Sequence, residues 1–223
     1  MIFANRREAG ARLAKRLLEF KDSNPVVLAL VRGGVPVAFE VAQALSAPLD
    51  IILVRKIGAP SQLELAIGAV ADGPKPEIVT NDELIENIPI PANYIAEVVK
   101  RELGEIDRRR KLYLRGRTRA EVKGKTAIVI DDGIATGATT RAALRSVRRQ
   151  KPKHLVLAIP VAPASSLEAL ASEADEIVCL STPEPFGAIG YFYQDFHQVE
   201  DEEVIALLGR SKATIDKTAA SPR

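Results

Sequence analysis

The chain has 223 residues, 47% of them apolar, and its 31 lysines and arginines nearly balance 29 aspartates and glutamates, for a formal net charge of +2. This length suits one large domain or one domain with an insertion, and the charge balance alone argues for no polyanionic partner. The single cysteine excludes a disulfide framework and indicates a reducing compartment. The N-terminus lacks a signal-peptide pattern and no segment is long enough to span a membrane, so we expect a cytoplasmic protein without a membrane partner.

The first half of the chain predicts alternating helices and strands. Apolar residues at helical spacing predict a helix over about 5–20. PVVLALV predicts a buried strand that ends at R-G-G, residues 32–34, and VPVAFEVAQAL predicts the helix after it. DIILVRK predicts a second strand that ends at R-K, residues 55–56. IGAVA and EIVT predict short strands, and residues about 81–113 are expected to be helical.

The second half continues the alternation. TAIVIDD predicts a buried strand, followed by a glycine loop and the helix TRAALRSVRRQ. HLVLAIPVA, SSLEALASEA and DEIVCL predict a further strand, helix and strand. Strands that are apolar on both faces predict an α/β fold, with a central parallel sheet flanked by helices. A last helix, EEVIALLG, precedes a polar tail over 211–223 that we expect to be disordered.

Unusual residues follow three of the predicted strands, in VRGGVP, VRKIGAP and VIDDGIATGATT. In open α/β sheets, ligands bind at the carboxyl ends of the strands. We therefore expect these three strand ends to converge on one site.

Two adjacent acids and a loop rich in Gly and Thr follow the strand TAIVI. Asp131 and Asp132 come first, and the loop then leads into a helix, whose free backbone N–H groups favour an anion. The stretch is not a Walker P-loop, because the spacing is wrong and the lysine is missing. A sugar phosphate, with hydroxyls at one end and a phosphate at the other, would suit both features. The alternative is a plain turn in which a threonine caps the next helix.

VIDDGIATGATT resembles the phosphoribosyl pyrophosphate signature of the type I phosphoribosyltransferases. The resemblance implies that Asp131 and Asp132 hold the ribose hydroxyls and act in catalysis. It implies phosphoribosyl pyrophosphate and a nucleobase-like acceptor as partners, and Mg²⁺ as the cofactor. The residues that would cradle the terminal phosphate of the sugar are Ala135, Thr136, Gly137, Ala138 and Thr139.

The other two strand ends have counterparts in the same family. The loop of Arg32, Gly33 and Gly34 is similar to the family's pyrophosphate loop, and the resemblance puts a non-proline cis peptide near Val31–Arg32. By itself R-G-G is a common packing device at a strand–helix turn.

The R-K pair, Arg55 and Lys56, resembles the pair that opens the mobile catalytic loop of adenine and orotate phosphoribosyltransferases. A basic pair at a strand end more often faces solvent, which is the alternative. Glu64, farther along this loop, is our candidate for any proton transfer.

A basic run, RRRKLYLRGRTR, covers residues 108–119 and contains seven basic residues and no acid. A solvated helix end is the default interpretation. The alternatives are a mobile lid over pyrophosphate and a nucleic-acid patch, and the single aromatic in the run makes nucleic acid an unfavoured partner.

Five of the ten aromatic residues of the chain lie between Phe186 and Phe196. The cluster is either a small satellite core or a stacking surface for a flat ligand. It resembles the hood of hypoxanthine-type phosphoribosyltransferases, which implies that Phe186 stacks on the base. The same comparison implies that Asp195 joins Asp131 and Asp132 near the metal.

These features predict one phosphoribosyltransferase domain over 1–210, with a helical or flexible insertion at about 72–119 and a hood at about 181–199. The expected function is Mg²⁺-dependent transfer of a phosphoribosyl group to a nitrogenous base, in nucleotide metabolism. The main alternative is a non-catalytic protein that senses a nucleotide or the donor. A sugar-phosphate hydrolase is a third candidate, and the identity of the base and a homo-oligomeric state remain open.

Overall fold

The computed structural model describes residues 1–60, 62–73 and 75–219, without the side chains of Glu64, Glu83 and 212–219. A parallel five-stranded sheet with the order β2-β1-β6-β7-β8 forms the core. Helices cover both faces of this sheet, which is why its strands are apolar on both faces. The predicted α/β class is confirmed. The strands are β1 (Pro25–Leu30), β2 (Leu49–Ile52), β6 (Thr126–Ile130), β7 (His154–Val161) and β8 (Glu176–Ser181).

The two faces of the sheet bury alternate strand residues, because successive side chains of a strand point to opposite sides. Val27 and Ala29 of β1 face one helical layer, and Val26 and Leu28 face the other. The first layer contains α1 (Arg6–Arg16), a 3-10 turn at Leu18–Phe20, α2 (Gly34–Leu45) and α7 (Asp201–Ala219). The second contains α5 (Ala138–Arg148) and α6 (Ala164–Leu170).

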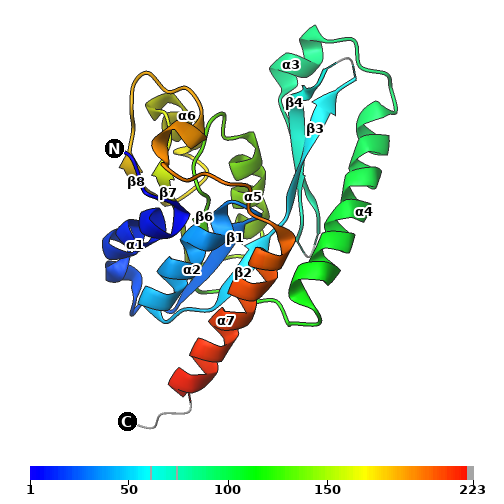
Figure 1. Ribbon diagram of the computed structural model, residues 1–223. Helices are drawn as coiled ribbons and strands as arrows, with labels where there is room; N and C mark the ends of the chain where they lie inside the picture. The colour runs from blue at the N-terminus through cyan, green and yellow to red at the C-terminus, as the bar shows by residue number, and fades with distance from the viewer. Residues whose placement is uncertain (61, 74, 220–223) are drawn as a thin grey trace.

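A second unit, which we call the arm, comprises residues 54–114. Figure 1 shows its β3–β4 hairpin extending beyond the core, with α3 at the tip and α4 running back along it. Apolar residues of the hairpin and of α4, including Ile57, Ile67 and Ile106, share one buried cluster. The antiparallel sheet of the arm contains β3 (Val54–Ala59), β4 (Gln62–Ala71) and β5 (Glu77–Thr80), and its helices are α3 (Asp82–Asn87) and α4 (Tyr94–Leu114).

The single strand predicted over DIILVRK is wrong, because the chain changes sheets within it. β2 ends at Ile52 in the parallel sheet, and β3 begins at Val54 in the arm. Between them, the N–H of Leu53 donates to the carboxylate of Asp72 at 3.1 Å. The insertion into the core domain therefore starts at residue 54. The sequence pattern instead predicts a start at about residue 72. The apolar run 51–54 crosses from β2 into β3 without a turn residue, so it gave no sign of the change.

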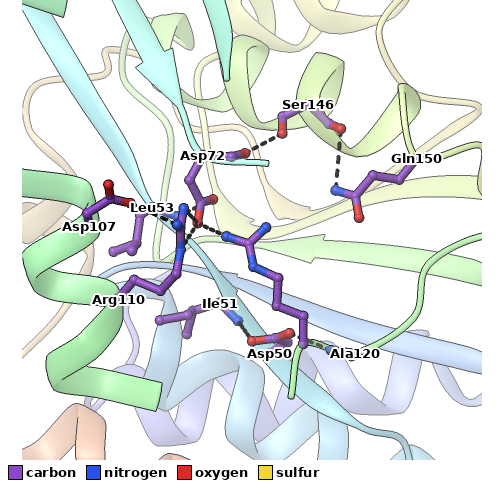
Figure 2. A network of polar contacts seen from close by, with 10 residues as sticks. Asp50, Ile51, Leu53, Asp72, Asp107, Arg110, Ala120, Ser146 and Gln150 are labelled. Atoms are coloured by element: carbon purple, nitrogen blue, oxygen red, sulfur yellow. Dashed lines mark hydrogen bonds and ion pairs between the residues drawn. The ribbon is translucent and has the colours of Figure 1, made fainter. Parts of the chain in front are cut away.

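Asp72 joins the arm to the core, as Figure 2 shows. Its buried carboxylate accepts hydrogen bonds from Arg110 Nη2 at 2.9 Å and from Arg119 Nη2 at 2.6 Å. Its backbone carbonyl accepts a hydrogen bond of 2.5 Å from Ser146 Oγ on α5. Together with the hydrogen bond from Leu53, these contacts join Asp72 to four segments. They are the residue before β3, helix α4, the segment that leads to β6, and helix α5.

The hood over 181–199 packs against the N-terminus of the chain. The N–H of Phe3 donates to Phe192 O, and the N–H of Gln194 donates to Phe3 O, both at 2.8 Å. A 3-10 turn, η2 (Ile189–Phe192), lies in this segment. Among the described helices, none is both long enough and apolar enough to cross a membrane.

The disordered tail predicted from residue 211 starts too early. α7 continues through Ala219, so most of that stretch is helical, and residues 220–223 lie outside those the structure describes.

Candidate functional site

The loops that follow β1 and β6 lie side by side at the carboxyl edge of the central sheet, because the two strands are neighbours. The peptide Val31–Arg32 is cis, as the resemblance implied. A Cβ on Gly33 would collide with Asp132 Oδ2, and one on Gly34 would stand 2.6 Å from Ile130 O. Only glycines let these loops approach so closely.

Arg6, in the first turn of α1, forms a buried ion pair with Asp132. Its Nε donates to Asp132 Oδ2 at 2.7 Å, and its Nη1 donates to His197 O at 2.8 Å. Its guanidinium lies 3.8 Å from the ring centroid of Phe196. Arg6 and Asp132 are each 7% exposed. Asn5 caps the helix and fixes where α1 begins, which sets the direction of Arg6.

The two adjacent acids have different surroundings. Burial raises the pKa of Asp132 above its ordinary value, and Arg6 opposes that rise. Burial, with the charge of Asp132, raises the pKa of Asp131 well above its ordinary value. Asp131 accepts a hydrogen bond of 2.9 Å from the N–H of Asp132. Among the described side chains, no cation forms an ion pair with Asp131.

The predicted phosphate loop, residues 135–139, leads into the uncapped N-terminus of α5. Gly137 occupies the cap position with φ of 79°, and no side chain among those described caps the helix. The first N–H groups of a helix have no partner within it, so they are available to an anion. Ser166 Oγ, in α6, donates to Ala135 O at 2.6 Å and holds the loop in place.

A cavity of about 340 Å³ lies between this loop and the arm. Lys56 of β3 lines it together with Thr136, Thr139 and Arg141, and none of the described residues that line it is acidic. Ala138 of α5 also lines it, and the remaining lining residues come from the arm and include Leu65. The cavity therefore pairs a cationic side with an apolar wall.

The three strand ends predicted to converge do so in part: the loops after β1 and β6 contact each other, and one residue of the third strand end reaches the cavity beside the loop after β6. The third lies in the arm, where Arg55 turns away and its Nε donates to Glu102 of α4 at 2.7 Å. Lys56 alone of the basic pair lines the cavity. Glu64, our candidate for proton transfer, belongs to β4, but its side chain lies outside the described residues.

Arg32 lies at the edge of an open cleft of about 410 Å³, which Gly33, Asp132 and Phe196 also line. Its Nη1 is 3.5 Å from Asp201 Oδ1 at the start of α7. These loose contacts leave the guanidinium, with 28% of the side chain exposed, accessible to a ligand in the cleft.

Aromatic residues of the hood pack mainly against one another. The ring centroid of Phe186 lies 5.1 Å from that of Phe192, and both belong to a small apolar cluster around Phe3 and Tyr193. This packing matches the satellite-core alternative, and stacking of Phe186 on a base stays a prediction. The hood also contacts the acid loop, since a Cβ on Gly133 would meet the side chain of Ile189.

Asp195 does not join the two acids in a metal-binding cluster. Its carboxylate lies 3.0 Å from His197 Nδ1, and 59% of the side chain is exposed. Among the described residues, no group of three or more His, Cys, Asp and Glu side chains could hold a metal ion. A metal at Asp131 and Asp132 would therefore need ligands from a substrate or water.

Ion pairs within the chain occupy much of the basic run 108–119. Glu105 and Asp72 accept four of its arginines, which matches the default interpretation of a helix end and gives no support to a nucleic-acid patch. The pairs are Arg108–Glu105 at 2.8 Å, Arg109–Glu105 at 2.6 Å, Arg110–Asp72 at 2.9 Å and Arg119–Asp72 at 2.6 Å.

Sequence reasoning missed Arg6, Tyr193 and Phe196 as parts of the site. Tyr193 donates its hydroxyl to the backbone carbonyl of Asp132 at 2.5 Å. A signal for Arg6 was present, because it falls three and seven residues before Ala9 and Leu13 on the buried face of α1. An arginine on a buried face needs a carboxylate partner. Nothing comparable marked Tyr193 or Phe196 within the aromatic cluster.

Comparisons with known proteins extend the likeness to most of the chain. The family model described as phosphoribosyl transferase domain matches residues 2–195. Proteins from two strains of Mycobacterium tuberculosis, whose names give them provisionally as phosphoribosyl transferases, are 44% identical over 211 residues. The match covers 94% of this chain but 47% of theirs, so the chain spans about half the length of these curated relatives. A crystal structure from Thermus thermophilus has 42% identity and a TM-score of 0.79, and the match covers 93% of this chain and 98% of that one.

Proposed function

This chain belongs to the phosphoribosyl transferase domain family, and we propose that it transfers the phosphoribosyl group of phosphoribosyl pyrophosphate to a nitrogenous base. One observation carries the proposal. The acid pair 131–132 contacts the glycine loop 32–34 on one side and leads on the other into the uncapped N-terminus of α5. The donor has the same order of groups: a pyrophosphate, then ribose hydroxyls, then a terminal phosphate.

In the proposed reaction, the bond between the anomeric carbon and a pyrophosphate oxygen breaks, and a bond from that carbon to a nitrogen of the base forms. Positive charge develops on the sugar as the first bond breaks. The carboxylates at 131–132 would stabilise this charge. The amides at 137–139 would hold the terminal phosphate. Arg32 would balance charge on the departing pyrophosphate.

Mg²⁺ fits this site as an ion that the donor brings with it. In phosphate chemistry, proteins commonly hold Mg²⁺ through one or two carboxylates together with phosphate oxygens of the substrate. Asp131 and Asp132 meet that need, although Arg6 already neutralises one of them. When bound, the ion would neutralise the leaving group.

The test is release of pyrophosphate from phosphoribosyl pyrophosphate and Mg²⁺, with single bases supplied one at a time. We expect release with at least one base, and loss of release when Mg²⁺ is withheld. Binding of ribose 5-phosphate, measured by calorimetry, tests the cradle separately. Binding without turnover on any base would favour the alternative of a non-catalytic sensor. Absence of both would refute the proposal.

A further inference from the structure

We propose that Arg6 assigns different tasks to the two adjacent acids. It keeps Asp132 as a fixed brace between α1 and the glycine loop, and it leaves Asp131 as the carboxylate that meets the sugar. This inference rests on the proposed function and adds to it a positioning residue from outside the three strand-end loops.

Asp132 lines the open cleft beside Arg32, but its side chain and backbone are held by three neighbouring segments. Oδ2 accepts the 2.7 Å hydrogen bond from Arg6 and lies where a Cβ on Gly33 would collide with it, so the carboxylate faces the glycine loop. The backbone carbonyl of Asp132 accepts the 2.5 Å hydrogen bond from Tyr193. With 7% of the residue exposed, little of this carboxylate is left for a ligand.

Arg6 cannot easily leave this position, because three groups hold its guanidinium. It donates to Asp132 and to His197 O, and it stacks on Phe196. A planar guanidinium can make these contacts together, whereas the ammonium of a lysine could not also stack. Breaking a buried pair by removing one partner leaves an uncompensated charge, which is strongly destabilising.

Asp131 has the opposite character. More of its surface is exposed than that of Asp132, and it forms no ion pair with a described cation. It accepts a hydrogen bond from the N–H of Asp132. Its remaining acceptor positions can therefore receive ribose hydroxyls or the water around a cation.

The pairing of Arg6 with Asp132 also reduces the negative charge that a phosphorylated donor would meet at the site. Two adjacent carboxylates would repel a donor that carries several negative charges. Arg6 cancels one of them from inside the protein, so Arg32 and Lys56 remain available at the cleft and the cavity.

A double-mutant cycle tests the division of tasks. We would measure ribose 5-phosphate binding by calorimetry for Arg6→Gln, Asp132→Asn and the double variant. Arg6→Gln should weaken binding by about tenfold or more, because it leaves Asp132 buried and unpaired. The double variant has no buried charge, and it should recover to within about threefold of the wild type. Asp131→Asn should weaken binding in the wild-type and double-variant backgrounds alike.

The controls separate this inference from the proposed function. Arg7→Gln is matched to Arg6→Gln, since Arg7 is the next residue of α1 and pairs with Glu40 at the surface, and it should leave binding unchanged. If the double variant binds no better than Arg6→Gln, Asp132 contacts the sugar directly and the inference fails. If the wild type neither binds ribose 5-phosphate nor releases pyrophosphate with any base, the proposed function fails instead.

A folding readout covers the case in which Arg6→Gln does not fold. Urea unfolding of the same cycle needs no ligand, and it should show a coupling between Arg6 and Asp132. Arg6→Lys should keep the charge but raise KM for the donor more than it lowers kcat. A change confined to kcat would contradict a positioning role.

Discussion

The hydroxyl of Tyr113 donates a hydrogen bond of 2.6 Å to the carboxylate of Asp201. Tyr113 lies at the end of α4 in the arm, and Asp201 begins α7 in the core. Arg32 Nη1 lies 3.5 Å from the same carboxylate oxygen. The arm, the C-terminal helix and the glycine loop therefore meet at one acid.

This contact predicts a change in stability at alkaline pH. Burial, with the hydrogen bond to Asp201, raises the pKa of Tyr113 to about 12. An unfolded tyrosine loses its proton near pH 10, so the folded state binds the proton more tightly and stability should fall as pH rises from about 10 to 12. Tyr113→Phe should reduce that fall, measured by urea unfolding across this range. Tyr191→Phe is the control, because Tyr191 is 74% exposed. Equal pH dependence in the two variants would contradict the prediction.

Arg32→Ala should weaken the binding of pyrophosphate more than the binding of ribose 5-phosphate, because the proposal places only pyrophosphate at the glycine loop. We expect a loss of about tenfold for pyrophosphate, in the range of one charge-assisted hydrogen bond, and little loss for the sugar phosphate. Isothermal calorimetry with each ligand measures both. Arg108→Ala removes an exposed cation from α4 and serves as the control. Equal losses for the two ligands would place Arg32 elsewhere.

Lys56→Met should weaken the binding of ribose 5-phosphate, because the lysine lines the cavity beside Thr136 and Thr139. The affinity of the wild type should fall with added salt, and this dependence should be weaker in the variant, since a cation that faces a phosphate is screened by salt. Lys100→Met changes an exposed lysine of α4 and should have no effect. An unchanged affinity in Lys56→Met would mean that the phosphate binds without the arm.

Asp72→Ala should lower the free energy of unfolding by about 3 kcal/mol, because the buried N–H of Leu53 and the part-buried Arg110 and Arg119 lose their shared acceptor. Asp107→Ala breaks a pair with Arg110 whose acid is 62% exposed, so its effect should stay below about 1 kcal/mol. Urea unfolding gives both values. Similar losses of unfolding free energy in the two variants would contradict the prediction that Asp72 stabilises the junction between the arm and the core.

Ala135 predicts a preference among acceptors. In the type I family that the signature resembles, the 6-oxopurine enzymes usually have an Asp at this position, which takes a proton from the purine ring, whereas Ala is usual in adenine-type signatures. Alanine cannot accept a proton, so hypoxanthine and guanine should be poor acceptors for this chain. Because Ala135 is exposed, Ala135→Asp adds no buried charge, and it should raise turnover of hypoxanthine. Robust turnover of guanine by the wild type, unaffected by Glu64→Gln, would contradict this idea.

The parallel core could be predicted because its strands are apolar on both faces and are separated by amphipathic helices. The adjacency of the loops after β1 and β6 followed from the same pattern. The arm could not be predicted, because the apolar run 51–54 crosses from β2 into β3 without a turn residue. In the structure, the hydrogen bond from Leu53 to Asp72 lies at the change of sheet. The pairing of Arg6 with Asp132 spans 126 positions in the chain, and no local pattern could link them.

The bond from Ser146 to the carbonyl of Asp72 has a mechanical consequence. Ser146 lies near the end of α5, and Ala138 and Thr139, which line the cavity, lie at the beginning of the same helix. Eleven residues of α-helix form a stiff rod of about 16 Å. A tilt of the arm would therefore be transmitted along this helix to the amides that we propose bind the phosphate of the donor.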